Sequence, residues 1–407
     1  DTKISKVAFL LATLFIKNHI WTNVEKLMRI LLIGEYSGLH NSLKEGLEKN
    51  GHEVTLVGSG DGFKKYPMDI KIESTIFEFP LLKALAKLID KIFRVSLNEI
   101  EIWLKTKMIL HKLVGYDVVQ LVNENAFRTI PSLQISLLKY ILNNNKKLFL
   151  LSCGTDYKSV KHSIDKKFRY SILTPLLNNK NLKKLYKPIL KYLTKDYIKL
   201  HDFLLKNING IISSDLDYHI PYIGDEKYLG MIPNPINIEK NNFNQLEINN
   251  RIKIFHGINK KNYVKKGNKY FEKAMEVIKS KYKDKIEYRK SIDIPHKDYL
   301  NHYQNCHILL DQVYAYDQGY NALEAMSKGK VVFTGAEKEW LEYYNVEEDK
   351  IAINALPSVN YIVSKIEWLI NNPDELKLIS KNARKFIEKY HHYITVAKEY
   401  ENIWSKN

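Results

Sequence analysis

The chain has 407 residues, of which 45% are hydrophobic and 27% charged, and its formal net charge at pH 7 is +17. This composition excludes a disordered chain, and the length favours two domains over one. The only cysteines, Cys153 and Cys306, lie far apart, which argues against a disulfide framework or a thiolate zinc site and fits a reducing compartment. The positive charge suits an anionic partner: nucleic acid, a membrane surface or a phosphorylated substrate.

The first 27 residues differ from the rest. Lys3 and Lys6 precede an apolar run, Val7–Ile16, that is too short to span a bilayer. No small-residue cleavage site follows the run, and Met28 stands directly before a strand. We expect residues 1–27 to be an extension outside the fold, with a membrane-contacting N-terminal helix as the alternative.

The next two hundred residues alternate strands and helices. A β-α-β order within about thirty residues predicts a parallel sheet with helices on its faces. We place a linker where Pro221 and then Pro233-Asn234-Pro235 break regular structure. The predicted strands are Arg29–Ile33, Glu53–Val57, Asp117–Val122, Lys147–Leu151 and Gly210–Ser213, and the clearest helices are Ser42–Asn50 and Ile89–Leu113.

A second α/β run begins at Arg251. The pattern predicts an α/β protein with two doubly wound, Rossmann-like domains, 28–235 and 236–389, an interdomain cleft, and a last helix in 390–407. The predicted strands are Ile252–His256, Lys285–Arg289, His307–Asp311, Val331–Thr334 and Ile351–Ile353. The predicted helices are Asn268–Tyr282, Lys297–Asn305, Gly319–Lys328, Lys338–Tyr344, Val359–Asn371, Pro373–Lys389 and Tyr393–Trp404.

The most informative segment is Asp311–Trp340, which reads as strand, loop, helix and strand. Free N–H groups at the helix start (Gly319, Tyr320, Asn321) suit a diphosphate, and the carboxylate of Glu324 suits a ribose diol. A nucleotide sugar has both groups. In the alternative interpretation, Glu324 faces solvent and Gly319 is an ordinary turn glycine.

Two further loops follow predicted strands. The loop from Gly34 to Gly38 has neither the dinucleotide fingerprint nor a Walker A pattern, so it is a ligand-edge turn or a simple strand-to-helix turn. The loop after the strand Ile252–His256 contains Gly257, and its lysines Lys260, Lys261 and Lys266 either neutralise phosphate or form a solvated basic loop.

Ser152–Asp156 follows another strand. Cys153 is interpreted as a small core residue, and Asp156 either contacts a sugar hydroxyl or caps a helix. The thirteen histidines show no metal-ligand spacing, and we therefore expect no bound metal.

Lys158–Lys206 carries thirteen Lys or Arg against three Asp. From Pro188 onward its apolar residues keep helical spacing. This basic amphipathic helix either lies on an anionic membrane surface or packs on its own sheet with a lysine-rich outer face.

The segment that contains Gly319, Glu324-Ala325-Met326 and Gly329 resembles the retaining glycosyltransferases of family 4, which have the GT-B fold. Their pattern E-x-F-G-x-x-x-x-E-A-M-A-x-G precedes a buried strand, as here. The resemblance implies that Glu324 binds the nucleotide ribose and that the N–H groups at Gly319–Asn321 meet the diphosphate. The first Glu of the pattern is replaced by Tyr316, with Asp317 next to it, so Asp317 would contact the donor sugar.

The phosphate clamp of that family, G-R…K-G, is matched by Gly257 and by Lys266-Gly267, while Ile258 replaces the Arg and Lys260 or Lys261 compensates. The resemblance implies a metal-independent, hexosyltransferase-type enzyme that moves a sugar, with retention, from a nucleotide sugar to a glycan or lipid-linked acceptor in bacterial surface-polysaccharide synthesis. No cofactor is expected, because the nucleotide sugar is a substrate.

Candidate catalytic residues are Asp156 and Asp317, and the candidate acceptor-side loop residues are Gly34, Gly38 and Thr155. The expected location is the cytoplasm, with peripheral binding to the inner face of the membrane through residues 158–206.

Two alternatives stay open at this point. A nucleotide-sugar 2-epimerase shares the fold but needs acid and base groups around the sugar, and the sequence shows no clear set. A basic nucleic-acid-binding protein needs a positive face interleaved with aromatic residues, whereas the 27 tyrosines are spread along the chain. We therefore expect no nucleic-acid partner.

Overall fold

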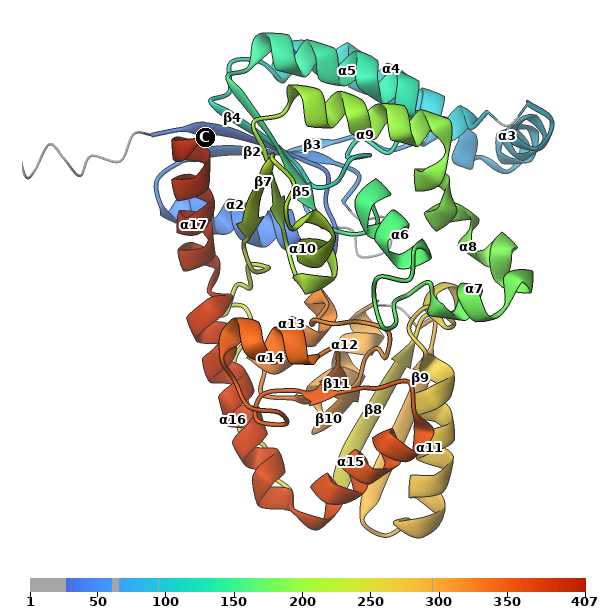
Figure 1. Ribbon diagram of the computed structural model, residues 1–407, viewed down its shortest axis with the longest axis vertical. Coiled ribbons are helices and arrows are strands. Elements are labelled where there is room, and N and C mark those ends of the chain that lie inside the picture. Colours follow the sequence, from blue (N-terminus) through green and yellow to red (C-terminus); the bar gives the residue numbers. More distant parts are fainter. Residues whose placement is uncertain (1–26, 61–65, 94, 295) are drawn as a thin grey trace, which may run out of the picture.

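A computed structural model describes residues 27–60, 66–93, 95–294 and 296–407. It contains two α/β domains, one above the other in Figure 1, and each is built on a parallel sheet. The predicted fold class is therefore confirmed. The predicted N-terminal extension lies, except for its last residue, outside the described residues.

The N-terminal domain has a seven-stranded sheet in the order β3-β2-β1-β4-β5-β6-β7, with every neighbouring pair parallel. Its interior strand β1 buries Ile30–Ile33 completely, as expected for a parallel strand covered on both faces. The strands are β1 (Arg29–Ile33), β2 (Glu53–Gly58), β3 (Ile70–Lys71), β4 (Val118–Leu121), β5 (Lys147–Ser152), β6 (Gly210–Ser213) and β7 (Tyr228–Met231). The helices are α2 (Leu39–Lys49), α3 (Pro80–Phe93), α4 (Leu97–Ile109), α5 (Pro131–Asn144), α6 (Tyr157–Ile164), α7 (Thr174–Asn178), α8 (Lys183–Leu190), α9 (Lys195–Asn207) and α10 (Leu216–Tyr222).

The C-terminal domain has a five-stranded parallel sheet in the order β12-β11-β10-β8-β9. Its strands are β8 (Ile252–Ile258), β9 (Ile286–Ile292), β10 (Ile308–Leu310), β11 (Val331–Thr334) and β12 (Ile353–Asn354). Its helices are α11 (Asn268–Lys281), α12 (His296–Gln304), α13 (Tyr320–Ser327), α14 (Lys338–Tyr344), α15 (Val359–Asn371) and α16 (Pro373–Tyr390), and α17 (Tyr393–Lys406) follows.

The order of strands reverses once in each sheet, between β1 and β4 and between β8 and β10. Ligands of doubly wound sheets bind in the crevice at such a point, outside the carboxyl ends of the strands. In the C-terminal domain, the loops at this point are the one after β8, which contains Lys266, and the one after β10, which ends at Gly319. The topology therefore brings together the two loops that the sequence singled out.

The chain ends in the N-terminal domain. Along one side of the molecule α16 leads into α17, which packs against α2 (Figure 1). Helix α17 buries Tyr400 and Trp404 completely, and the Trp404 ring lies 6.4 Å from the ring of Phe149 in β5. The predicted return of the C-terminal helix to the N-terminal domain is confirmed.

The structure corrects two helix predictions in the N-terminal domain. The single helix predicted over Ile89–Leu113 is wrong: α3 ends at Phe93 and α4 begins at Leu97, with Ser96 as its N-cap accepting the N–H of Glu99 at 3.3 Å. The prediction ran through this break because apolar residues continue on both sides of it. The linker was also predicted to begin too early, at Pro221. This proline lies inside α10, and strand β7 follows before the chain leaves the sheet.

The basic segment Lys158–Lys206 does not form one amphipathic helix. Thr194 has an extended backbone and separates α9 from the turns before it. Tyr197, Leu200 and Leu204 of α9 are buried, and α9 packs on α5. The structure thus supports packing on the protein's own core, and the apolar side of this segment is not available to a lipid surface.

Across the described ranges, no helix combines the length and the apolar character needed to cross a bilayer.

Gly46 tests the packing of α17 on α2. A Cβ at this position would lie 2.3 Å from the carbonyl oxygen of Tyr393 and 2.9 Å from the Cβ of Ala397. Gly46→Ala should therefore destabilise the protein by about 1–3 kcal/mol, although Ala is the better helix former by about 1 kcal/mol. Thermal unfolding measures the effect. Glu48→Ala, at an exposed position of the same helix, is the control, and equal midpoints for both variants would contradict this packing.

Candidate functional site

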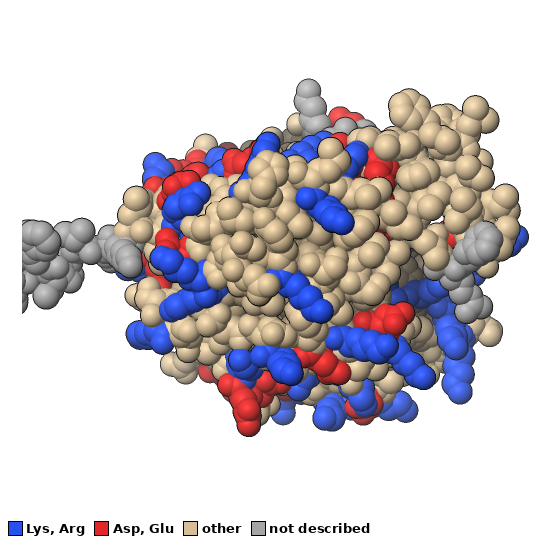
Figure 2. All heavy atoms as spheres, turned by 90° about the horizontal axis from the view of Figure 1, so that it is seen from above, with Lys and Arg blue, Asp and Glu red and all other residues tan. Residues whose placement is uncertain are grey.

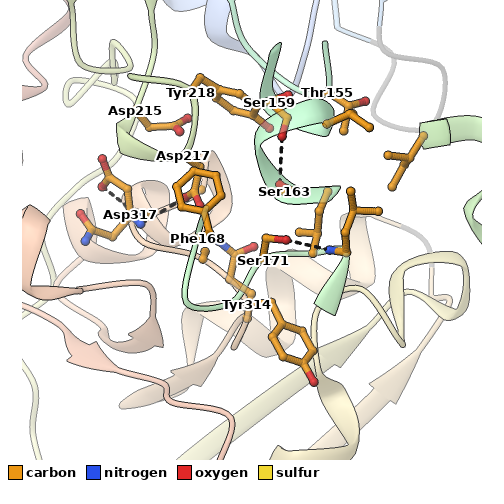
Figure 3. A pocket seen from close by; sticks show the side chains of 18 residues that line it. Thr155, Ser159, Ser163, Phe168, Ser171, Asp215, Asp217, Tyr218, Tyr314 and Asp317 are labelled. Atoms are coloured by element: carbon orange, nitrogen blue, oxygen red, sulfur yellow. Dashed lines mark hydrogen bonds between the residues drawn. The ribbon is translucent and has the colours of Figure 1, made fainter. Parts of the chain in front are cut away.

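A cavity of about 160 Å³ lies between the domains, where loops after β5, β6 and β10 meet. All three loops follow carboxyl ends of parallel strands, the edge at which such sheets bind ligands. Figure 3 shows Asp215, Asp217 and Asp317 together on one side of it, with Ser159 and Ser163 of α6 nearby. The N-terminal domain contributes Thr155, Ser159, Val160, Ser163, Phe168, Ser171, Ile172, Leu173, Ile189, Asp215, Asp217 and Tyr218, and the C-terminal domain contributes Gln312, Tyr314, Ala315, Asp317, Gln318 and Gly319.

Two aspartates, one from each domain, hold the domains together by accepting backbone N–H groups of the opposite domain. Asp217 accepts the N–H of Tyr316 at 3.1 Å and that of Asp317 at 3.2 Å. In return, Asp317 accepts the N–H of Leu216 at 3.0 Å with one oxygen and that of Gln318 at 2.6 Å with the other. The exchange fixes the loop after β10 against the start of α10.

The carboxyl groups in this cluster resist ionisation. Removal from water is the main cause, and it raises the pKa of Asp217 to about 7 and that of Asp317 to about 6. For Asp217 the nearby charge of Asp317 adds to the effect, while the N–H groups that it accepts oppose it. Removal from water, followed by the charges of Asp217 and Asp317, raises the pKa of Asp215 well above its usual value. Asp217 and Asp317 therefore titrate at about pH 7 and 6, where an ordinary aspartate is already ionised.

Asp215 has an oxygen to offer a ligand. Its Oδ2 accepts the hydroxyl of Ser214 at 2.9 Å, whereas its buried Oδ1 has no hydrogen-bond partner among the described residues. Asp215 and Asp217 were not among the residues predicted from sequence. A signal was present: Ser214-Asp215 directly follows strand β6, at the carboxyl edge of the sheet.

The predicted phosphate-binding lysine is part of a polar chain. The Nζ of Lys266 lies 2.8 Å from Oδ1 of Asp311, which also accepts the side chain of Asn321 at 2.9 Å. Asn321 in turn accepts the hydroxyl of Tyr299 at 3.0 Å. The other oxygen of Asp311 is buried without a partner among the described residues. The structure thus links Lys266 to the first turn of α13, as one phosphate-binding surface requires.

The remaining predicted residues after β8 differ in their surroundings. Lys260 and Lys261 lie on a 3₁₀ turn, and both are exposed and outside the lining of the cavity. Gly257 lies against Tyr299, because a Cβ there would come within 2.3 Å of its ring. A glycine at this position therefore serves packing as well as access for a ligand.

Glu324 is half-buried on α13. Burial first, and then the charge of Glu324, raises the pKa values of the Tyr303 and Tyr320 hydroxyls. Glu324 also opposes the lowering of the Lys328 pKa that burial causes. This carboxylate therefore lies among hydroxyl and ammonium groups rather than in bulk solvent.

The start of α13 touches the other domain. Gly319 is its N-cap and lines the cavity. The hydroxyl of Tyr320 lies 2.6 Å from Oγ of Ser42 in α2, 3.2 Å from the carbonyl oxygen of Gly38 and 3.1 Å from that of Pro235. The N–H groups of a helix's first turn have no partners within the helix. The predicted anion-binding end of α13 thus lies at the domain interface.

The predicted acceptor-side residues divide into two groups. Thr155 lines the cavity. Gly34 and Gly38 adopt left-handed backbone angles, with φ values of 88° and 99°, and belong to a loop closed by Glu35. Glu35 accepts the N–H groups of Gly38 and Asn41, each at 2.9 Å. This loop is locked by its own hydrogen bonds and by Tyr320.

Asp156 has the capping role that the sequence left open. It is fully buried and caps α6, where Oδ1 accepts the N–H of Ser159 at 2.7 Å. Its Oδ2 accepts the hydroxyls of Ser152 at 2.5 Å and Tyr222 at 3.2 Å. Both oxygens are occupied, so a direct catalytic role for Asp156 is not supported. The neighbouring Ser159 and Thr155 reach the cavity instead.

Within the part of the chain that the structure describes, no three His, Cys, Asp or Glu side chains form a group that could hold a metal ion.

Comparisons with known proteins agree with this architecture. Residues 254–402 match the family described as glycosyl transferase-like. No curated protein sequence matches the chain significantly. The family match covers the C-terminal domain and the helix that returns from it, which are the parts that carry Lys266, Gly319 and Glu324.

Solved structures match nearly the whole chain. HepE from Anabaena, in complex with UDP and glucose, has a TM-score of 0.56 at 12% identity, covering 94% of this chain and 100% of its own. Sucrose-phosphate synthase from Thermosynechococcus elongatus has a TM-score of 0.58 at 13% identity, covering 94% and 99%. MnaA from S. aureus, with UDP, has a TM-score of 0.51 at 11% identity, covering 93% and 95%. At such identities these matches establish a shared fold.

The carboxyl cluster predicts a pH dependence of stability. Because the folded state raises the pKa values of Asp217 and Asp317 above their usual values, their contribution is greatest at low pH and is lost as the pH rises through about 6 to 7. The wild type should lose about 1–3 kcal/mol between pH 5 and 8, and Asp217→Asn should lose less. Thermal unfolding across this range measures the slope.

The control for this prediction is Asp374→Asn, because the Asp374 side chain is 95% exposed. It should keep the wild-type slope. Identical slopes for Asp217→Asn and the wild type would show that the cluster does not titrate as described.

Proposed function

This chain is a GT-B protein with a glycosyl transferase-like C-terminal domain, and from this premise we propose that it transfers a sugar from a nucleotide-sugar donor to a glycan or lipid-linked acceptor. The observation that carries the proposal is the meeting of three groups at one interdomain cleft. These are the lysine loop after β8, the start of α13, and a sugar-sized cavity lined by carboxyl groups.

The donor would bind to the C-terminal domain. Lys266 and the N–H groups at the start of α13 suit the diphosphate, because the lysine carries a full positive charge and the helix start a partial one. Glu324, further along the same helix, suits the ribose hydroxyls. In the structure Lys266 pairs with Asp311. An incoming diphosphate would therefore either share Lys266 with this carboxylate or take its place beside the lysine. This pair keeps the lysine oriented before the donor binds.

The sugar would occupy the cavity. Asp317 lies one residue after the position at which the family pattern has its first Glu, and its two oxygens already accept N–H groups. Asp215, whose Oδ1 has no partner among the described residues, is therefore the better placed carboxyl group for a sugar hydroxyl. Carboxyl groups that keep protons near neutral pH can also donate hydrogen bonds, which widens the range of hydroxyl partners.

The chemistry would rest on the departing nucleoside diphosphate. Its negative charge grows in the transition state, and Lys266 with the amides at Gly319–Asn321 would stabilise it where the domains exclude water. The acceptor would approach from the N-terminal domain beside Thr155 and Ser159. We further propose retention of configuration, independence from metal ions, a hexose donor, and a place in polysaccharide synthesis in the cytoplasm, all by resemblance to family 4.

One observation favours a second candidate, the nucleotide-sugar 2-epimerase. An epimerase needs acid and base groups around the sugar, and Asp215, Asp217 and Asp317 form such a group with raised pKa values. We rank it second because Asp217 and Asp317 already bind backbone across the interface.

Glu324→Gln tests the donor site. Loss of hydrogen bonds to a charged carboxylate should weaken UDP binding about 10- to 100-fold, as measured by calorimetry. Glu276→Gln, at an exposed position on α11, serves as the control and should bind as the wild type does. UDP is the first probe because similar structures hold it, and other nucleoside diphosphates follow in the same assay. Unchanged affinity of Glu324→Gln for every nucleotide that the wild type binds would remove the ribose assignment.

A turnover assay separates the two candidate enzymes. Nucleotide sugars are incubated with and without saccharide acceptors, each in the presence of EDTA. A transferase should release nucleoside diphosphate in an acceptor-dependent way, and EDTA should leave the rate unchanged. Conversion of the donor to its epimer without any acceptor would instead select the epimerase.

A further inference from the structure

Helix α3 exposes a continuous apolar stripe. Leu81, Leu85, Leu88 and Ile92 are 88%, 48%, 53% and 60% exposed. Their spacing of four, three and four residues places them on one face of the helix, while Ala86 on another face is buried. Helix α3 projects from the N-terminal domain at the right of Figure 1, and none of the four stripe residues belongs to either of the two hydrophobic cores.

Further apolar side chains are exposed on the two elements that contact α3. Phe79 and Ile76 in the turn before α3 are 66% and 50% exposed, and Leu104 and Met108 of α4 are 50% and 74% exposed. Soluble proteins rarely leave contiguous apolar patches of this kind without a partner. The contrast with α9 is informative, because α9 buries its apolar side within the protein.

The charge around α3 is positive. The helix has three lysines against one aspartate, and Lys87 and Lys91 are exposed beside the stripe. The lysine-rich α8 occupies the same side of the molecule in Figure 1. Seen from above in Figure 2, the right-hand end of the molecule is a nearly uncharged bulge with Lys and Arg gathered next to it. An apolar stripe flanked by lysines matches the boundary between acyl chains and anionic headgroups.

We propose that α3 docks the protein on an anionic lipid bilayer. Leu81, Leu85, Leu88 and Ile92 enter the boundary between headgroups and acyl chains, and Lys87 and Lys91 contact lipid phosphates. A second copy of the chain would bring lysines against lysines in a molecule of net charge +17, which opposes self-association. The docking surface goes beyond the proposed catalytic function and does not depend on it.

Vesicle flotation tests the proposal with the full chain. Phosphatidylcholine vesicles are compared with vesicles in which about a third of the lipid is phosphatidylglycerol. The wild type should float with the anionic vesicles only. The triple variant Leu85→Gln, Leu88→Gln, Ile92→Gln should bind at least 100-fold more weakly. The double variant Lys87→Gln, Lys91→Gln should bind at least about tenfold more weakly than the wild type.

The matched control replaces exposed apolar residues elsewhere. Val277→Gln with Leu378→Gln changes two residues of the C-terminal domain, each 44% exposed, and should float as the wild type does. The stripe variants should also keep the wild-type thermal midpoint and nucleotide affinity, because their side chains contact solvent. These readouts separate loss of docking from loss of fold or of donor binding.

Two results would overturn the proposal. One is equal flotation of the wild type and the stripe variant. The other is a wild type that ignores anionic vesicles but sediments as a dimer, with the stripe variant a monomer, which would assign the stripe to a second copy of the chain.

Discussion

The relation between the two domains depends on an exchange of carboxylates for backbone amides. Asp217 of one domain accepts N–H groups of Tyr316 and Asp317, and Asp317 of the other accepts that of Leu216. Buried N–H groups must find acceptors, and here each domain supplies them to its neighbour. The exchange holds the loop after β10 against the start of α10, and both segments line the cavity. Arg169 extends the interface through ion pairs of 2.6 Å with Glu337 and Glu339.

The same exchange shapes the chemistry of the cavity. Carboxyl groups taken from water favour their protonated forms, and the N–H groups that they accept only partly offset this. Asp215, which binds no backbone of the other domain, keeps one oxygen without a partner among the described residues. A site that binds neutral sugar hydroxyls gains from such groups, since they can accept or donate. The diphosphate side of the cleft has the opposite character, with Lys266 and a helix start.

Two amphipathic segments of the N-terminal domain differ in whether their apolar side is buried. The sequence leaves open whether the basic segment that contains α9 binds a membrane surface or packs on the protein, and in the structure its residues Leu200 and Leu204 are fully buried. Helix α3, in contrast, keeps its leucines exposed. The spacing of apolar residues in a sequence shows that one face of a helix is apolar. Whether protein, lipid or another chain covers that face is decided by what lies opposite.

The sequence by itself determined the α/β class, the strands other than β3 and β7, the helices of the C-terminal domain and the loops after β8 and β10, because side-chain period, turn glycines and caps act over a few residues. It singled out Lys266, Gly319 and Glu324 for the same reason, since they belong to local strand-loop-helix patterns. It did not determine that Asp215 and Asp217 face Asp317, one hundred residues away, or that Asp156 is enclosed by Ser152 and Tyr222. Those contacts depend on how the two domains pack and how α17 returns, and packing between distant segments leaves no local pattern. The tertiary structure alone therefore decided which carboxyl groups share one cavity and which apolar face remains open.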